Sequence, residues 1–285
     1  MKTISLPTAV QHCAKRIPMS LVIAAAIFLQ HDAMATPTTV DLGSASDFAV
    51  LAGSGITIAG AVNTTTITGD IGTYPTPAIT GLGNVVLNGA NQTADTSLML
   101  SAKNDLTSAF NTAAGAPVTT YYPAISDLGG LTLMAGVYND PTSFGLTGTL
   151  TLDAQGNPNA IFIIQAGSTL ITASSSSVVL INGAQACHVF WVVGSSATLG
   201  TDTDFMGNIL ADQSITLTTG ATVVGQLLAE NGAVTLDDNT ITVPVCNVAS
   251  VPDSGSTFLL LGFGLALLFA FRLFLLRKHP VSRSL

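Results

Sequence analysis

Gly207-Asn208-Ile209-Leu210-Ala211-Asp212-Gln213 is followed 18 residues later by Gly225-Gln226-Leu227-Leu228-Ala229-Glu230-Asn231, and the two stretches match in residue type at every position. The segments after them also match, because Ser214-Ile215-Thr216-Leu217 corresponds to Ala233-Val234-Thr235-Leu236. Each repeat contains short apolar runs bounded by Gly, Asn, Asp or Ser, which is typical of strands separated by turns. A period of about 18 to 20 residues with three strand segments predicts an all-β solenoid, in which each repeat forms one coil.

One segment departs from this pattern and predicts a helix at about residues 91–114. Gly115 and Pro117 follow it, as expected where a helix ends. Its apolar residues recur at helical spacing, at Leu98, Ala102, Leu106, Ala109, Phe110 and Ala113. No neighbouring segment is helical enough to pair with it, so we expect the helix to lie along one side of the solenoid.

Residues 1–35 have the layout of a secretory signal peptide. Lys2, Lys15 and Arg16 form a basic region. An apolar run at residues 19–29 and the small-residue triplet Ala33-Met34-Ala35 follow. We therefore expect an exported protein, displayed at the cell surface or released from the cell.

The C-terminus has the layout of a membrane anchor. Residues 257–276 are apolar apart from Arg272 and are close to the roughly 20 residues that span a bilayer as a helix. Residues 277–285 are basic, which predicts a cytoplasmic tail. Directly before the apolar run stands Val251-Pro252-Asp253-Ser254-Gly255, and this combination resembles the VPDSG type of PEP-CTERM sorting signal. The resemblance implies that an exosortase-type membrane protease is a partner and removes the anchor; a plain anchor is the alternative.

Between these ends, residues 36–250 form one domain with an unusual charge. Over residues 36–256, Lys103 is the only Lys or Arg, against fourteen Asp and one Glu (Glu230), so one positive and fifteen negative side chains give a net charge of −14. Nucleic acid and anionic lipid surfaces are therefore excluded as partners, since phosphate binding depends on Lys and Arg. The surface must consist mainly of Thr, Ser, Asn and Gly.

The cysteines of the domain are Cys187 and Cys246, because Cys13 falls in the signal peptide. An even number of cysteines in an exported domain predicts one disulfide. It would close a loop of about 60 residues and contribute about 4 kcal/mol in the chain-entropy model. Two free buried thiols are the alternative.

Several segments together, rather than one motif, carry a family resemblance that runs from Phe48 to Pro244. They are Gly69-Asp70-Ile71-Gly72, the helix after Asn91, Ala135-Gly136-Val137-Tyr138, residues 190–199 and residues 225–241. The chain resembles the ice-binding-like β-solenoid proteins of cold-adapted microbes. This resemblance implies a right-handed, discontinuous, triangular β-helix with one long helix alongside, and it implies binding to ice without a cofactor or metal. The chain departs from many relatives at Ala135, where they carry Pro, and at Gln226 and Leu227, in a region where they carry an Arg.

Ice offers neither charge nor a pocket, so a surface that binds it must be flat, rigid, uncharged and periodic. A Thr at the same place in each coil meets this need, because its hydroxyl bonds a water and its β-branched side chain is already ordered. The family often carries Thr-Ala/Gly-x-Thr/Asn on its ice face. Thr219-Gly220-Ala221-Thr222 fits this motif, and Thr172-Ala173-Ser174-Ser175 fits with Ser for Thr. The two Asp of Thr201-Asp202-Thr203-Asp204 depart from it.

These matches predict a first row of ice-binding residues at Thr172, Ser174, Ser175, Thr201, Thr203, Thr219, Thr222 and Thr240. A second row at Thr198, Thr216 and Thr235 is the alternative. The domain contains 34 Thr, so ladders of Thr are expected on more than one wall whatever the function.

An enzyme is the competing class of function, and the sequence argues against it. Lys103 and His188 are the only Lys and His of the domain, whereas acid–base and nucleophilic sites usually need such groups beside a carboxylate or nucleophile. Carboxylates do pair at positions typical of turns: Asp202 with Asp204, Asp237 with Asp238, and Asp212 with Glu230. No complete calcium-loop signature is present. A structural or adhesive surface protein without ice activity remains the second hypothesis.

Overall fold

The computed structural model describes residues 39–123 and 126–247. The predicted signal peptide, sorting motif, transmembrane segment and basic tail (residues 1–35, 251–255, 257–276 and 277–285) lie outside the described residues. Within those residues, no helix combines the length and apolar character needed to cross a bilayer.

The described chain folds into three parallel sheets of eight strands each, as the repeat predicts. Sheet A contains, in spatial order, β4 (Asp70–Thr73), β1 (Phe48–Ala52), β22 (Leu227–Ala229), β19 (Asn208–Ala211), β16 (Val189–Val193), β13 (Phe162–Ala166), β10 (Gly136–Asp140) and β7 (Thr120–Tyr121). Sheet B contains β5 (Ile79–Thr80), β2 (Gly55–Ala59), β23 (Ala233–Asp237), β20 (Ile215–Leu217), β17 (Ala197–Leu199), β14 (Leu170–Thr172), β11 (Phe144–Leu146) and β8 (Ser126–Asp127). Sheet C contains β6 (Val85–Asn88), β3 (Thr65–Thr68), β24 (Thr240–Thr242), β21 (Thr222–Val224), β18 (Asp204–Met206), β15 (Ser177–Ile181), β12 (Thr149–Asp153) and β9 (Thr132–Met134).

The coils do not stack in the order of the sequence. Strands β1 to β6 form two coils at one end, and the chain then crosses to the other end through the helix α2 (Thr96–Ala114). From there, successive coils return until β22, β23 and β24 pair in parallel with β1, β2 and β3. The solenoid is therefore discontinuous, and its first coils are held by its last.

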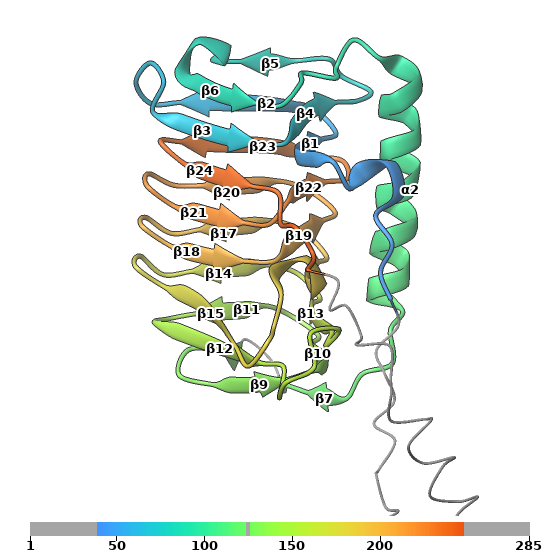
Figure 1. Ribbon diagram of the computed structural model, residues 1–285, viewed down its shortest axis with the longest axis vertical. Helices are drawn as coiled ribbons and strands as arrows, with labels where there is room; N and C mark the ends of the chain where they lie inside the picture. Colours follow the sequence, from blue (N-terminus) through green and yellow to red (C-terminus); the bar gives the residue numbers. More distant parts are fainter. Residues whose placement is uncertain (1–38, 124–125, 248–285) are drawn as a thin grey trace, which may run out of the picture. The chain divides into compact units, whose positions relative to one another are not determined.

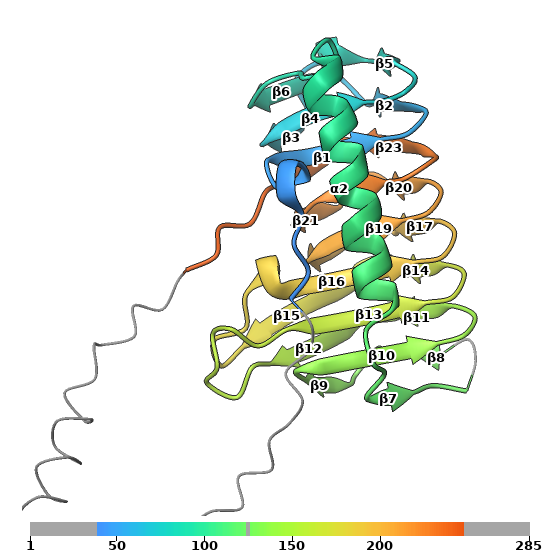
Figure 2. The same ribbon diagram turned by 90° about the vertical axis from the view of Figure 1, so that its right-hand side faces the viewer.

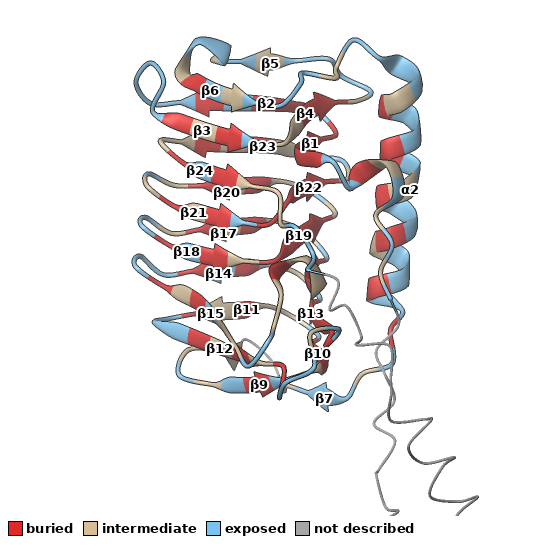
Figure 3. Ribbon diagram, viewed as in Figure 1, coloured by how far each residue is buried: buried red, intermediate tan, exposed pale blue. Residues whose placement is uncertain are grey.

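Every second side chain of a strand points into the solenoid, and together these side chains fill its interior. Figure 3 shows buried residues along the strands of all three sheets. The first residue of the repeat is Gly because two coils approach closely there. A Cβ on Gly225 would lie 1.9 Å from the carbonyl oxygen of Gly207, and Gly207 has a φ of +114°. The matching glycines of the repeat are thus required by the stacking itself.

Helix α2 covers the outer face of sheet A (Figure 2). Its apolar side packs on Leu51, Ile163, Phe190, Val192, Leu210 and Leu228 through Met99, Ala102, Leu106, Ala109 and Ala113. The helix begins at Thr96 rather than near residue 91, because the Asp95 side chain accepts a hydrogen bond from the Leu98 N–H (3.0 Å) and caps it. Sheets B and C are therefore the two walls whose outer faces the helix leaves open to solvent.

The described residues include three short 3-10 helices: η2 (Gly43–Ala45) before β1, η3 (Leu82–Asn84) between β5 and β6, and η4 (Ala186–His188) between β15 and β16. Helix η4 carries Cys187, which forms a disulfide with Cys246. The predicted bridge is therefore confirmed. The bond fastens the chain after β24 to the connection between β15 and β16, where one coil passes into the next.

Candidate functional site

The outer face of sheet B carries five threonines in register, one on each of five neighbouring strands. Thr80 pairs with Thr57, Thr57 with Thr235, Thr235 with Thr216, and Thr216 with Thr198. We call these five residues the threonine row; their strands β5, β2, β23, β20 and β17 lie one above another in Figure 2. The row contains the whole second row predicted from the sequence and extends it by Thr57 and Thr80.

The threonine row points outward because its neighbours along each strand point inward. In β20, for example, Ile215 and Leu217 are buried while Thr216 between them is partly exposed. The same alternation surrounds Thr235 in β23 and Thr57 in β2. Adjacent strands of a sheet lie about 4.8 Å apart, so the row presents one hydroxyl and one methyl at this interval.

Small residues flank the threonine row. On the side that precedes it in each strand stand Gly55, Ala233, Ser214 and Ser196. The hydroxyl oxygens of Ser196 and Ser214 each accept a bond from a backbone N–H of the next coil (3.3 Å in both cases). The serines therefore fasten neighbouring coils, and the flank is held at regular spacing.

Beyond Thr198 the row loses its regularity. The positions in register on β14, β11 and β8 are Ile171, Gly145 and Asp127. Ile171, next to Thr198, is 53% exposed and makes the surface apolar there, and Asp127 at the far end makes it charged. The ordered part of the wall is thus the half formed jointly by the first and last coils.

The first predicted row is not one surface. Thr172 and Thr203 are 3% and 0% exposed, and their hydroxyl oxygens lie 2.9 Å apart inside the corner between sheets B and C. Both side chains point inward because they continue the alternation of their strands, in which Ile171 beside Thr172 and Asp204 beside Thr203 are exposed. The expectation that Thr172 and Thr203 contact a target is therefore wrong.

The remaining members of the first row are divided between the corner and sheet C. Ser174, Ser175, Thr201 and Thr219 are exposed at the corner. Thr222 and Thr240 lie on the outer face of sheet C, in register with Asp204. Carboxylates bond directly to this set, since Thr222 Oγ1 donates to Asp204 (2.6 Å) and Thr219 Oγ1 donates to Asp237.

Sheet C presents a different chemistry from sheet B. Its central outward positions include Val179, Met206 and Val224, and the two valines are exposed. Together with Asp204, they give this part of the sheet a mixed aliphatic and acidic surface, while on β21, β24 and β3 the outward positions include Thr222, Thr240 and Thr66 in one row and Thr242 and Thr68 in the next. The Asp202/Asp204 and Asp237/Asp238 pairs belong to this wall and its corner with sheet B.

Lys103, the single cation of the domain, is remote from both open walls. Its Nζ lies under α2 and donates to the carbonyl oxygens of Ala229 (2.8 Å) and Glu230 (2.5 Å). Burial lowers the pKa of Lys103 from 10.5 to about 8, and the nearby Glu230 carboxylate opposes this change. Burial also raises the pKa of the Glu230 carboxyl. The Lys103 amine therefore links α2 to the end of β22 in sheet A.

A stack of rigid coils with an uncharged hydroxyl-and-methyl wall defines a class of protein that binds an extended surface rather than a small molecule. The family model for ice-binding-like proteins matches residues 50–242, so the chain belongs to that family. A second model, for the VPDSG-CTERM motif, matches residues 250–272 and confirms the sorting signal.

Relatives agree with this assignment over most of the chain. The ice-binding protein of Nostoc sp. (strain HG1) is 45% identical over 265 residues, which cover 90% of this chain and 96% of that protein. The ice-binding protein of Colwellia sp. is 34% identical over 255 residues, 84% of this chain and 97% of the relative. The crystal structure of an ice-binding protein from the Antarctic ascomycete Antarctomyces psychrotrophicus matches with a TM-score of 0.69 and 43% identity, covering 73% of this chain and all of that one.

Proposed function

We propose that this protein binds ice through the outer face of sheet B, with the threonine row at its centre. The observation that carries the proposal is the register of Thr80, Thr57, Thr235, Thr216 and Thr198 on five neighbouring strands. Membership of the ice-binding-like family supports ice as the target. The exposed corner residues Thr201 and Thr219 border this face.

The threonine row suits ice for physical reasons. Each hydroxyl can both donate and accept a hydrogen bond, and each methyl restrains the waters beside it. Thr is stiff at χ1, and the strands beneath are fixed by their ladders, so little conformational entropy is lost on contact. The surface therefore orders water before ice arrives.

The other faces are less suitable. Sheet A lies under α2. The corner and sheet C place Asp202, Asp204, Asp237 and Asp238 within or beside the predicted first row, and carboxylates hold water in their own geometry. On sheet B the carboxylates are confined to its edge, at Asp237, and to its far end, at Asp127.

The test compares one bulky substitution on the two walls. Thr216→Tyr inserts a large ring into the centre of the threonine row, whereas Thr222→Tyr places the same ring on sheet C. We expect Thr216→Tyr to abolish most ice-recrystallisation inhibition and ice affinity of the purified protein, while Thr222→Tyr retains both. Unchanged circular dichroism would show that the coils remain intact.

Each other result leads to a definite conclusion. With full activity in Thr216→Tyr, loss in Thr219→Tyr would assign the site to the corner, and loss in Thr222→Tyr would assign it to sheet C. No ice activity in the unmodified protein would contradict the proposal and favour a structural or adhesive role at the cell surface. A catalytic role has little support, because Lys103 lies under α2 and His188 lies beside the disulfide.

We also infer that the protein is exported and that an exosortase-type protease removes its C-terminal membrane segment, so that ice binding occurs at or outside the cell surface. The matched VPDSG-CTERM motif supports this route. Mass spectrometry of the mature protein should find its C-terminus within or near residues 251–255. An intact C-terminus at Leu285 would instead indicate a permanent anchor.

A further inference from the structure

Two sulfur atoms and one imidazole nitrogen gather where the chain leaves the last coil. Cys187 and His188 belong to η4, and Cys246 follows β24. One ligand atom from each of the three residues lies within 4.8 Å of the other two. Cys246 is 58 residues from His188 in the sequence, so only the fold brings it to the adjacent pair Cys187 and His188.

His188 is oriented as a metal ligand. Its Nδ1 lies 3.1 Å from the carbonyl oxygen of Pro158, which can only accept, so Nδ1 carries the proton. In the neutral imidazole Nε2 then presents a lone pair, and it lies 3.6 Å from the Sγ of Cys246. Metal-binding histidines are typically held in this way, with the second ring nitrogen bonded to a carbonyl or carboxylate.

The distance between Nε2 and Sγ fits a shared tetrahedral ion. With a Zn–S distance of about 2.3 Å and a Zn–N distance of about 2.05 Å, two tetrahedral ligand atoms lie about 3.6 Å apart. The two sulfurs of a zinc site would need a separation of about 3.8 Å, which requires the disulfide to be open. Cys246 is exposed and lies outside the strands, so its sulfur has room to move.

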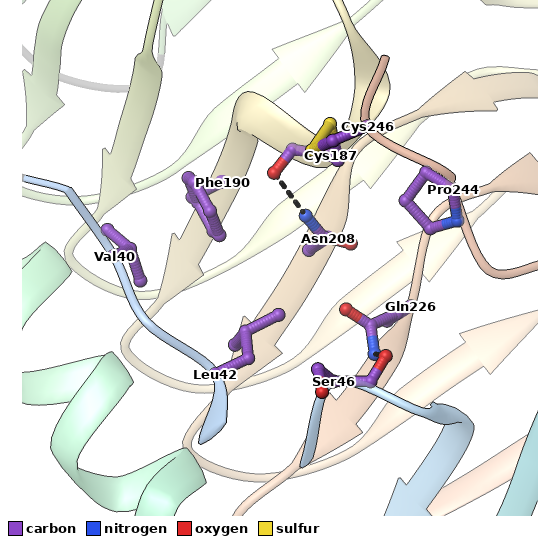
Figure 4. A pocket seen from close by; sticks show the side chains of 9 residues that line it. All are labelled: Val40, Leu42, Ser46, Cys187, Phe190, Asn208, Gln226, Pro244 and Cys246. Atoms are coloured by element: carbon purple, nitrogen blue, oxygen red, sulfur yellow. Dashed lines mark hydrogen bonds between the residues drawn. A yellow bond between two sulfur atoms is a disulfide. The ribbon is translucent and has the colours of Figure 1, made fainter. Parts of the chain in front are cut away.

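A pocket adjoins the two cysteines and offers space for water beside them. It has a volume of about 200 Å³, and Cys187, Cys246 and Asn208 line it (Figure 4). Asn208 is 1% exposed, and its Nδ2 donates to the carbonyl oxygens of Cys187 (3.4 Å) and Val189 (3.2 Å). Among the described residues its Oδ1 has no hydrogen-bond partner, so it can accept from a water in the pocket.

We propose that the dithiol form of this protein binds one Zn²⁺ through Cys187 Sγ, Cys246 Sγ and His188 Nε2, with water in the fourth position. A dithiol reductant first transfers two electrons to the disulfide and becomes a disulfide itself, leaving two thiols on the protein. Zn²⁺ then displaces the two thiol protons and binds the thiolates. The disulfide and the metal ion are two alternative links between Cys246 and η4. Cys246 lies five residues before the VPDSG motif begins.

Cobalt is a suitable probe, because tetrahedral Co²⁺ with thiolate ligands absorbs visible and near-ultraviolet light. The test uses the full chain with Cys13→Ser, so that only two thiols remain. After reduction with a phosphine, we expect one Co²⁺ per chain, displaced by Zn²⁺, and no such spectrum from the oxidised protein. His188→Ala should weaken binding by at least about tenfold and change the visible bands.

The oxidised His188→Ala protein serves as the folding control, because its disulfide remains and its circular dichroism should match that of the parent. Equal Co²⁺ affinity with and without His188 would overturn the proposed ligand set. Absence of binding by the reduced protein, or the same spectrum from the oxidised protein, would overturn the site itself.

Discussion

Raising the pH above 8 is expected to stabilise the fold through Lys103. The Nζ of this residue is buried between α2 and sheet A, where it donates to the carbonyl oxygens of Ala229 and Glu230. Burial disfavours the charged form and lowers the pKa of Lys103 from 10.5 to about 8 in the folded protein. In the unfolded chain the same amine keeps its proton up to about pH 10.5.

The sign and size of the effect follow from these two pKa values. Between about pH 8 and 10.5 the unfolded chain binds more protons than the folded protein, so the free energy of unfolding rises with pH. Below pH 8 both states are protonated, and the folded protein bears the full cost of the buried charge. The interval from about 8 to 10.5 corresponds to at most about 3 kcal/mol, since one pKa unit is worth about 1.4 kcal/mol.

The assay is urea unfolding of the oxidised protein at pH 7, 8, 9 and 10, in parallel with Lys103→Met. The variant lacks the amine but retains the tyrosines and carboxyl groups, so subtracting its curve isolates Lys103. We expect the free energy of unfolding of the parent, minus that of Lys103→Met, to rise by about 1 to 3 kcal/mol from pH 7 to pH 10. A difference that is flat or falls with pH would refute the assignment of a buried, destabilising charge.

Two further substitutions test the packing that supports the proposed site. Leu106→Ala should lower the free energy of unfolding by about 2 to 5 kcal/mol, because Leu106 is 0% exposed between α2 and sheet A. Leu100→Ala, at a 46% exposed position of the same helix, should change it by less than about 0.5 kcal/mol in the same urea titration. Gly225→Ala should destabilise by more than about 1 kcal/mol, since the new Cβ would lie 1.9 Å from the Gly207 carbonyl oxygen. Gly83→Ala, with no atom within 4 Å of the added Cβ, is its control, and equal melting temperatures for the two glycine variants would contradict the stacking argument.

Local patterns in the sequence predict much of the architecture. The match between residues 207–213 and 225–231 identifies one coil of a solenoid, because each coil must place turns and apolar strands at the same positions to stack. The helical spacing from Leu98 to Ala113 likewise predicts α2, although its start depends on the cap at Asp95. The bridge between Cys187 and Cys246 was predicted from an even number of cysteines in an exported domain, and the structure contains it.

The sequence offered part of the threonine row, Thr198, Thr216 and Thr235, as the alternative site, but it did not show how far the row extends. Thr57 and Thr80 join Thr216 only because the first two coils stack on the last one, and no periodicity links residues separated by a crossover helix. Thr172 and Thr203 were expected in the first row, yet they point inward, because they alternate with the exposed Ile171 and Asp204 next to them in the chain. Repetition along the chain thus determined that coils form. Tertiary structure decided which coils meet and which wall the helix covers, because those contacts depend on packing between distant segments.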